Sequence, residues 1–392
     1  MALPRSAGIL IPLFSLRTRE DLGRGEILDL KSMIDFALAM GHRVIQLLPI
    51  DETSAEELSP YSALSIFAID PIYISVHSID GVGPVVMRRA RKAVGPSRVV
   101  PRAIARNEKL KLLERAFRAS RRGPESNGPD APAFDAFVEA NRDWLYDYAL
   151  FRALKERFAW KPWEEWRAEI ARRDTDALKA ARRDLASAIA MYTYWQFLAH
   201  QQWTAMRAYA TARGVTLGGD LAFSPGHDSA EVWANQSIFD LTRTVGAPPD
   251  AFNLRGQRWG LPMPNWARMR AQGFRFWRAR ARRASALYDL IRIDHVVGLY
   301  RTFNFGVDAE ADAPGEFAPV NEDAQRTQGE EVMRAIKEEV GATEVVAEDL
   351  GTVPPWVRES LTAMGVPGYK VLQWERKNWD QPNESYISPA AY

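Results

Sequence analysis

The chain has 392 residues, of which 46% are hydrophobic and 26% are charged, and this composition is typical of a globular protein with a sizeable core. The formal net charge of +1 argues against nucleic acid and anionic membranes as partners and fits an uncharged substrate. The absence of cysteine excludes disulfides and thiolate chemistry, and with no signal-peptide core and no membrane-length apolar run we expect a cytoplasmic protein.

Short β-branched runs separated by amphipathic helices indicate a parallel sheet covered on both faces. The first strand is expected over 8–13, and a helix with apolar Leu30, Met33, Ile34 and Ala37 follows it. Further strands are expected over 43–49, 215–220, 290–294, 344–348 and 368–374, with a helix over 329–340. These six strands predict an α/β fold of the (β/α)8 TIM-barrel type. Because residues 375–392 are loop-like, we expect the barrel to be incomplete, without strands seven and eight.

Two long segments interrupt this alternation. We expect a helical insertion over 80–205, with a Gly/Pro/Ser-rich break over 121–133. Within it, Tyr148, Phe151, Leu154 and Phe158 recur at helical spacing and are expected in the core. Residues 221–272 are expected to form an irregular loop of the kind that binds or covers a substrate. The chain thus divides into barrel strands one and two (1–79), the insertion (80–205) and barrel strands three to six (206–392).

Two carboxylates follow consecutive predicted strands. Asp294 ends Ile291-Arg292-Ile293-Asp294, and Glu348 follows Val345-Val346-Ala347. If these strands are parallel neighbours, both acids leave the sheet at the same carboxyl-terminal edge, where barrel enzymes hold their catalytic groups. A carboxylate pair about 5–5.5 Å apart is what a retaining glycosidase mechanism requires.

The neighbours of the two acids suggest different roles. Arg292 lies two residues before Asp294 and so on the same face of the strand, where its charge would keep the carboxylate ionised. The apolar run before Glu348 would raise its pKa and prepare it to donate a proton. A structural Arg–Asp pair and a capping glutamate are the alternatives. Asp349, on the opposite face, is expected to fix the loop.

Other polar residues follow the predicted strands. Asp220, after Gly218-Gly219, is expected either to bind a sugar hydroxyl or to arrange Arg292, and Tyr61 could stack on a sugar ring. His295 either bonds a substrate hydroxyl or is structural, and His227 is expected to be structural. No His, Asp and Glu spacing matches a metal site, and the glycines do not form a phosphate-binding loop, so we expect no metal.

The motifs, taken in order, resemble those of the 4-α-glucanotransferases (amylomaltases or disproportionating enzymes) of glycoside hydrolase family 77. The resemblance covers almost the whole chain and is weakest over about 80–145. The matching segments are 58–71 (LSPYSALSIFAIDP), 194–198 (YWQFL), 219–220 (GD), 228–235 (DSAEVWAN), 246–252 (GAPPDAF), 256–260 (GQRWG), 292–295 (RIDH), 347–351 (AEDLG) and 368–373 (GYKVLQ).

The resemblance implies roles for individual residues. It implies Asp294 as the nucleophile and Glu348 as the acid/base. It further implies a set of substrate-binding residues, namely Arg292, Asp220, His295, Tyr61, Trp259, Ser59 and Asn235. Trp259 would belong to the loop at the acceptor site. The implied substrates, as donors and acceptors, are maltooligosaccharides and α-1,4-glucans, and no cofactor is needed.

The chain departs from the family pattern at several positions. Leu58 stands where an aspartate is usual, Val297 where an arginine is usual, and Leu261 where an asparagine is common. The family also has a third acid, in a His-Asp pair after strand seven, and the 392 residues contain no substitute for it.

These observations leave two classes of function open. The first is an enzyme that transfers α-1,4-glucan segments by a retaining double displacement, with an α-glucan hydrolase as the alternative. In it, the 246–266 loop would exclude water from the intermediate. The second is a catalytically inactive, truncated glucan-binding fragment.

Overall fold

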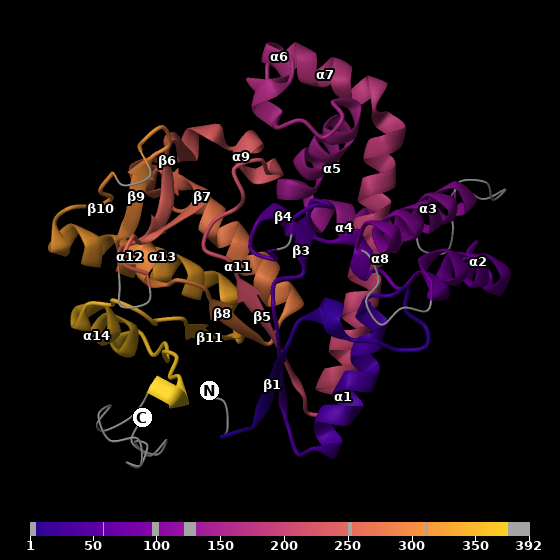
Figure 1. Ribbon diagram of the computed structural model, residues 1–392, viewed down its shortest axis with the longest axis horizontal. Coiled ribbons are helices and arrows are strands. Elements are labelled where there is room, and N and C mark those ends of the chain that lie inside the picture. Colours follow the sequence, from indigo (N-terminus) through magenta and orange to yellow (C-terminus); the bar gives the residue numbers. More distant parts are fainter. Residues whose placement is uncertain are drawn as a thin grey trace.

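The computed structural model describes residues 5–57, 59–95, 102–120, 131–249, 253–310 and 313–374 (Figure 1). Figure 1 shows a parallel sheet low in the centre, a helical region to its upper right and a second, antiparallel sheet to its upper left. In the described ranges, no helix combines the length and the apolar character that crossing a membrane requires.

The central sheet has five parallel strands in the described chain. Their order is β1 (Gly8–Ile11), β2 (Val44–Leu47), β5 (Thr216–Leu221), β8 (Leu290–Ile293) and β11 (Glu344–Ala347). These are the first five strands expected from the sequence. Apolar side chains of β2, β5, β8 and β11 are buried in one continuous core, whereas in β1 Ile9 and Ile11 are partly buried and Leu10 is exposed. The parallel order places the carboxyl ends of all five at one edge.

The expected sixth strand over 368–374 was wrong. Ala347 N–H donates to Pro367 O over 2.8 Å, but Tyr369 N–H donates to the Asp349 carboxylate over 2.7 Å. Because that carboxylate takes the N–H that a ladder would use, the segment runs beside β11 without pairing and ends in the 3-10 turn η7 (Leu372–Trp374).

Helices connect and cover the parallel strands. In α1 (Leu30–Ala39), the four apolar residues named above are buried, as expected. The helix predicted over 329–340 is α13 (Glu322–Val340), which begins earlier because Asn321 caps it and accepts from Ala324 N–H. The other helices of this half are α11 (Arg275–Leu287), α12 (Val297–Tyr300) and α14 (Pro355–Ala363).

The helical region expected between the second and third barrel strands is present. It contains α2 (Pro84–Val94), α3 (Arg102–Ser120), α4 (Ala131–Ala140), α5 (Arg142–Arg157), α6 (Ala168–Ala171), α7 (Thr175–Asp184) and α8 (Ala186–Thr211). Tyr148, Phe151 and Leu154 are buried and Phe158 is partly buried. The break predicted over 121–133 is shorter than expected at its end, because α4 begins at Ala131, and residues 121–130 lie outside the described ranges.

The expectation of an irregular loop over 221–272 was also wrong. The segment contains α9 (Ala230–Ala234), β6 (Phe239–Ala247), β7 (Gln257–Pro264) and α10 (Trp266–Ala271). With β9 (Thr302–Gly306) and β10 (Glu316–Ala318), these strands form an antiparallel sheet in the order β10-β9-β6-β7. The prolines and glycine of β7 are residues typical of turns, and the strand is partly exposed, so its sequence does not show the pattern of a buried strand.

A third pairing joins β3 (Asp51–Thr53) to β4 (Ala63–Ile69) antiparallel, just after β2. The loop between these two strands carries Ser59 and Tyr61. Short 3-10 turns complete the described elements, namely η1 (Leu13–Ser15), η2 (Ile27–Asp29), η3 (Pro71–Tyr73), η4 (Val76–Ser78), η5 (Trp163–Glu165) and η6 (Gln236–Ile238).

Candidate active site

Asp294 and Glu348 leave neighbouring strands at the same edge of the parallel sheet. Ile293 of β8 and Ala347 of β11 are register partners, and each acid is the next residue. Glu348 N–H donates to Ile293 O over 2.9 Å, and Asp294 N–H donates to Leu221 O over 3.1 Å. The expectation that both acids share one carboxyl-terminal edge is therefore confirmed.

The Asp294 carboxylate is held by an arginine on its own strand. Nη1 of Arg292 donates to Oδ1 of Asp294 over 2.7 Å and to both carboxylate oxygens of Asp220 over 2.8 and 2.9 Å. The Tyr61 hydroxyl donates to Oδ2 of Asp220 over 2.7 Å. Of the two roles expected for Asp220, the structure thus displays the arrangement of Arg292.

The charges of this cluster are strongly coupled. Burial alone would lower the pKa of Arg292, but the negative charges of Asp220 and Asp294 outweigh burial and raise it. Burial raises the pKa of Asp220 to about 6, despite the opposing charge of Arg292. The guanidinium therefore remains charged beside Asp294, as a nucleophile requires.

Glu348 has a different environment. Its Oε2 accepts the His295 N–H and its Oε1 accepts the Leu350 N–H, both over 2.9 Å. Burial raises the pKa of Glu348, with the charge of Asp294 acting in the same direction and the two N–H donors against it. A carboxyl group with a raised pKa beside a carboxyl group paired with arginine is an arrangement compatible with retaining glycosidase chemistry.

His295 lies between the two acids in an unusual conformation. Its φ is 48°, in the left-handed region that few non-glycine residues adopt and that is concentrated at functional sites. Its ring packs edge-on against Trp259, at 4.7 Å between centroids, and against Phe223, at 5.6 Å. Burial lowers its pKa to about 4, so the imidazole is neutral near pH 7 and can exchange hydrogen bonds with a hydroxyl.

Two cavities flank the carboxylates. One, of about 270 Å³, is lined by Asp294, Ser59, Tyr61 and Trp259 among others. The other, of about 220 Å³, is lined by Glu348, His295 and Trp259 among others. Trp259 lines both cavities, so Asp294 and Glu348 face separate spaces that share one aromatic side chain.

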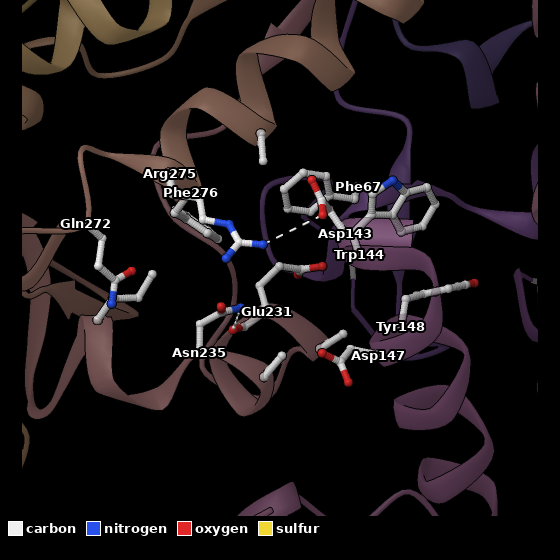
Figure 2. A pocket seen from close by; sticks show the side chains of 14 residues that line it. Phe67, Asp143, Trp144, Asp147, Tyr148, Glu231, Asn235, Gln272, Arg275 and Phe276 are labelled. Carbon is white, nitrogen blue, oxygen red and sulfur yellow. Dashed lines mark hydrogen bonds and ion pairs between the residues drawn. The ribbon is translucent and has the colours of Figure 1, made fainter. Parts of the chain in front are cut away.

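The structure does not bring Asn235 to this site. Asn235 lies at the end of α9 in a different cavity, of about 220 Å³, shown in Figure 2. There its side-chain amide donates to Glu231 O over 2.9 Å, and an ion pair of 3.7 Å joins Arg275 to Asp143 across the cavity. The substrate-binding role expected for Asn235 therefore has no support from its position.

Asp349 and His227 both make contacts that hold the surrounding structure. Asp349 fixes its loop as expected, accepting from Tyr369 N–H and, over 2.9 Å, from Arg358 Nε. His227 is structural as expected, with its ring stacked on Trp163 and its carbonyl accepting the indole N–H over 3.0 Å.

The three departures from the family pattern fall in different places. Val297 lines the Glu348 cavity and Leu261 lines the Asp294 cavity, so both apolar substitutions face the candidate site. Leu58 lies outside the described residues.

Two site residues were missed by sequence reasoning. The Tyr369 ring lies under the Arg292 guanidinium, with its centroid 5.4 Å away, and Phe223 packs on His295. Tyr369 lies in the segment expected to be a strand, and no pattern in the sequence pairs it with Arg292. Within the described residues, no group of three or more His, Asp or Glu side chains is placed to hold a metal ion.

The chain is similar to known proteins over most of its length. The model of the family described as 4-alpha-glucanotransferase matches residues 11–392. A 4-alpha-glucanotransferase of Chlamydia pneumoniae is 32% identical over 382 residues, covering 95% of this chain and 69% of that protein. One of Thermus thermophilus is 33% identical over 381 residues, covering 95% and 73%.

Solved structures give the same result. An amylomaltase from Streptococcus agalactiae in complex with acarbose superposes with a TM-score of 0.82 at 26% identity, covering 96% of this chain and 75% of that one. An amylomaltase from Corynebacterium glutamicum, at 24% identity, covers 97% and 52% with a TM-score of 0.78 and supports the fold alone.

These matches define an enzyme of the (β/α)8 TIM-barrel type that acts on α-glucans. The chain belongs to the 4-α-glucanotransferase family, glycoside hydrolase family 77. Its activity is that of a 4-α-glucanotransferase.

Proposed function

We propose that the protein moves α-1,4-glucan segments between maltooligosaccharides by a retaining double displacement, with Asp294 as nucleophile and Glu348 as acid/base. The observation that carries this assignment is the difference between two adjacent strand-end carboxylates. Asp294 is bound to the Arg292 guanidinium over 2.7 Å, whereas Glu348 lies on an apolar strand end that raises its pKa. One acid is thus paired with a cation, as suits a nucleophile, and the other is prepared to carry a proton.

In the first half-reaction, a carboxylate oxygen of Asp294 attacks the anomeric carbon of the donor. The bond from that carbon to the glycosidic oxygen breaks, and Glu348 gives its proton to the departing oxygen. The products are a β-linked glucosyl-enzyme on Asp294, a shortened glucan with a free 4-hydroxyl, and an ionised Glu348.

In the second half-reaction, Glu348 removes the proton from the 4-hydroxyl of an acceptor sugar. The acceptor oxygen attacks the anomeric carbon, the ester bond to Asp294 breaks, and an α-1,4 bond forms again. The two inversions give net retention, and both carboxyl groups return to their starting protonation states. None of these steps uses a cofactor.

The two cavities suggest how donor and acceptor are bound. The Asp294 cavity, with Tyr61 and Ser59 in its wall, would hold the donor sugar. The Glu348 cavity, with His295 in its wall, would hold first the leaving glucan and then the acceptor. Acarbose in the Streptococcus agalactiae amylomaltase supports α-linked glucose units as the ligands.

Transfer exceeds hydrolysis only when an acceptor, and not water, reaches the glucosyl-enzyme. Trp259, on β7 of the antiparallel sheet, packs on His295 and lines both cavities. We infer that this indole covers the junction between donor and acceptor and limits the access of water.

The direct experiment is incubation of the full-length protein with maltotriose and chromatography of the products. The expected result is glucose together with maltotetraose and longer oligosaccharides, with no net gain of reducing ends. Accumulation of glucose and maltose alone, with a matching gain of reducing ends, would contradict transfer. Loss of all products in Asp294→Asn, in a protein with unchanged circular dichroism, is expected as well.

A further inference from the structure

The loop between β3 and β4 carries two side chains of the candidate donor cavity, Ser59 and Tyr61. Residues 54–57 and 59–62 of this loop have no strand or helix hydrogen bonds to hold them. Bonds between side chains and backbone must therefore define the position of the Tyr61 ring.

Three hydrogen bonds run in series along this loop. Glu57 N–H donates to Ser54 Oγ over 3.2 Å, and Ser59 N–H donates to Glu57 Oε1 over 2.8 Å. Tyr61 N–H then donates to Ser59 Oγ over 3.2 Å. The side chains of Ser54, Glu57 and Ser59 thus each accept the backbone N–H of the next residue in the series.

The outer end of the series is bound by the helical insertion. Nη2 of Arg102, the first residue of α3, donates to Ser54 O over 2.9 Å and to Thr53 Oγ1 over 2.6 Å. One guanidinium thus caps the end of β3 and the first residue of the loop. Thr53 N–H also donates to the buried Asp70 carboxylate, over 3.3 Å, so this end of the loop is firmly placed.

The inner end of the series is the candidate active site. The Tyr61 hydroxyl donates to Asp220, and Arg292 joins Asp220 to Asp294. An unbroken path of hydrogen bonds therefore connects the helical insertion to the proposed nucleophile. Within the loop, the Ser62 N–H also donates to Ser59 O over 3.3 Å, which closes a turn around Tyr61.

We propose that Glu57 and Arg102 are positioning residues that hold the Tyr61 ring against the donor sugar. The inference rests on the proposed function of Asp294. Neither residue lines the cavity that Tyr61 and Asp294 share, so both would act through Tyr61. Glu57 is partly exposed and its neighbour Glu56 is fully on the surface, so the loop itself supplies a matched control.

The first test compares Glu57→Ala with Glu56→Ala, which removes the same charge from the next residue. Glu57→Ala is expected to raise the KM for maltotriose about three- to tenfold, the effect of one lost hydrogen bond, with a smaller change in kcat. Glu57→Gln is expected to restore the wild-type KM, because its amide oxygen still accepts from Ser59 N–H. Equal KM values for Glu57→Ala and Glu56→Ala would overturn the proposal.

The second test asks whether the effect passes through the ring. In a Tyr61→Ala background, Glu57→Ala is expected to change KM by less than about 1.5-fold, because the group it positions is gone. Full additivity of the two substitutions would contradict the proposed route. Arg102→Gln should behave like Glu57→Ala, whereas Arg91→Gln, an insertion arginine that bonds Glu20 away from the loop, should not.

Hydrogen exchange separates this inference from the proposed function. Amides of peptides that cover residues 54–62 are expected to exchange faster in Glu57→Ala than in Glu56→Ala, whether or not the protein is active. A wild-type protein without transferase activity would overturn the proposed function alone. Unchanged exchange in Glu57→Ala would overturn the positioning role alone.

Discussion

The backbone N–H of His295 donates to Oε2 of Glu348 over 2.9 Å, so the residue that follows the proposed nucleophile binds the proposed acid/base. The left-handed backbone of His295 accompanies this contact. The two strand ends are therefore joined at the two proposed catalytic residues, and the Glu348 carboxyl group is held by the backbone that follows Asp294. Substitutions at this pair of strand ends lead to the following predictions.

Replacement of Glu348 by glutamine should distinguish proton donation by Glu348 from attack by Asp294 in the first half-reaction. Glu348→Gln keeps an acceptor for His295 N–H but cannot donate a proton to a glycosidic oxygen. We expect kcat with maltotriose to fall by about 10²–10⁴-fold. With α-glucosyl fluoride, whose leaving group needs no proton, formation of the glucosyl-enzyme should be far less affected. Equal losses with both donors would argue against Glu348 as the acid.

The value of kcat/KM should fall at both low and high pH, with Asp220 causing the fall at low pH and Glu348 the fall at high pH. Asp220 must be ionised to hold Arg292, and burial raises its pKa to about 6, so activity should fall as the pH drops through about 6. Glu348 must be protonated, and burial raises its pKa, so activity should fall again as the pH rises through the pKa of Glu348. In Asp220→Asn, the acid limb should move or disappear. An unchanged acid limb in that variant would exclude Asp220 as its source.

The same shift has the opposite consequence for stability. Asp220 binds its proton more tightly in the folded chain than in the unfolded one, where the pKa is near 3.8. Its contribution to the free energy of unfolding is therefore complete below about pH 4 and is lost as the pH rises through about 6. Urea unfolding at pH 4, 5 and 7 should show that the pH dependence of the unfolding free energy in this range is reduced in Asp220→Asn.

Removal of the indole of Trp259 should favour water over the acceptor. In Trp259→Ala, the ratio of hydrolysis to transfer with maltotriose should rise several-fold, because the side chain common to both cavities is lost. Leu254→Ala is the control, since Leu254 lies in the same hairpin and is 85% exposed. Reducing-end and chromatographic assays run together measure the ratio. A ratio equal to that of the control would contradict the covering role of Trp259.

Asn235→Ala should leave the kcat/KM for maltotriose within about twofold of wild type, because surface substitutions away from a site have small effects. The structure puts Asn235 in the cavity of Figure 2, whereas Asp294 lines another. A large rise in KM would restore the substrate-binding role that the sequence motif had suggested.

The sequence was sufficient to predict where the two acids lie. Asp294 and Glu348 each end a β-branched run, and parallel pairing of such runs leaves little choice for their position. The same reasoning failed for 368–374, where a β-rich run is present but the Asp349 carboxylate takes the Tyr369 N–H. Whether this run becomes a strand depends on one side chain, that of Asp349, which lies twenty positions before Tyr369 and which no local pattern contains.

Three other features depend on partners that are distant in the sequence, so they could not be predicted from local patterns. The strands β6 and β7 are partly exposed and contain proline and glycine, so their sequences look like loops until their antiparallel partners are known. Asn235 belongs to a segment typical of the family, but a segment match does not determine which cavity a side chain faces. The contact of Arg102 with Ser54 joins residues 48 positions apart and leaves no periodic trace in the sequence.

A covalent bond between Asp294 and the donor sugar is the step on which the proposed mechanism depends. Glu348→Gln protein incubated with α-glucosyl fluoride, then denatured, digested and examined by mass spectrometry, tests this bond directly. We expect the peptide containing Asp294 to gain the mass of one glucosyl unit and the same peptide of an Asp294→Asn, Glu348→Gln protein not to gain it. A glucosyl unit on any other residue, or its presence in the double variant, would contradict the assignment.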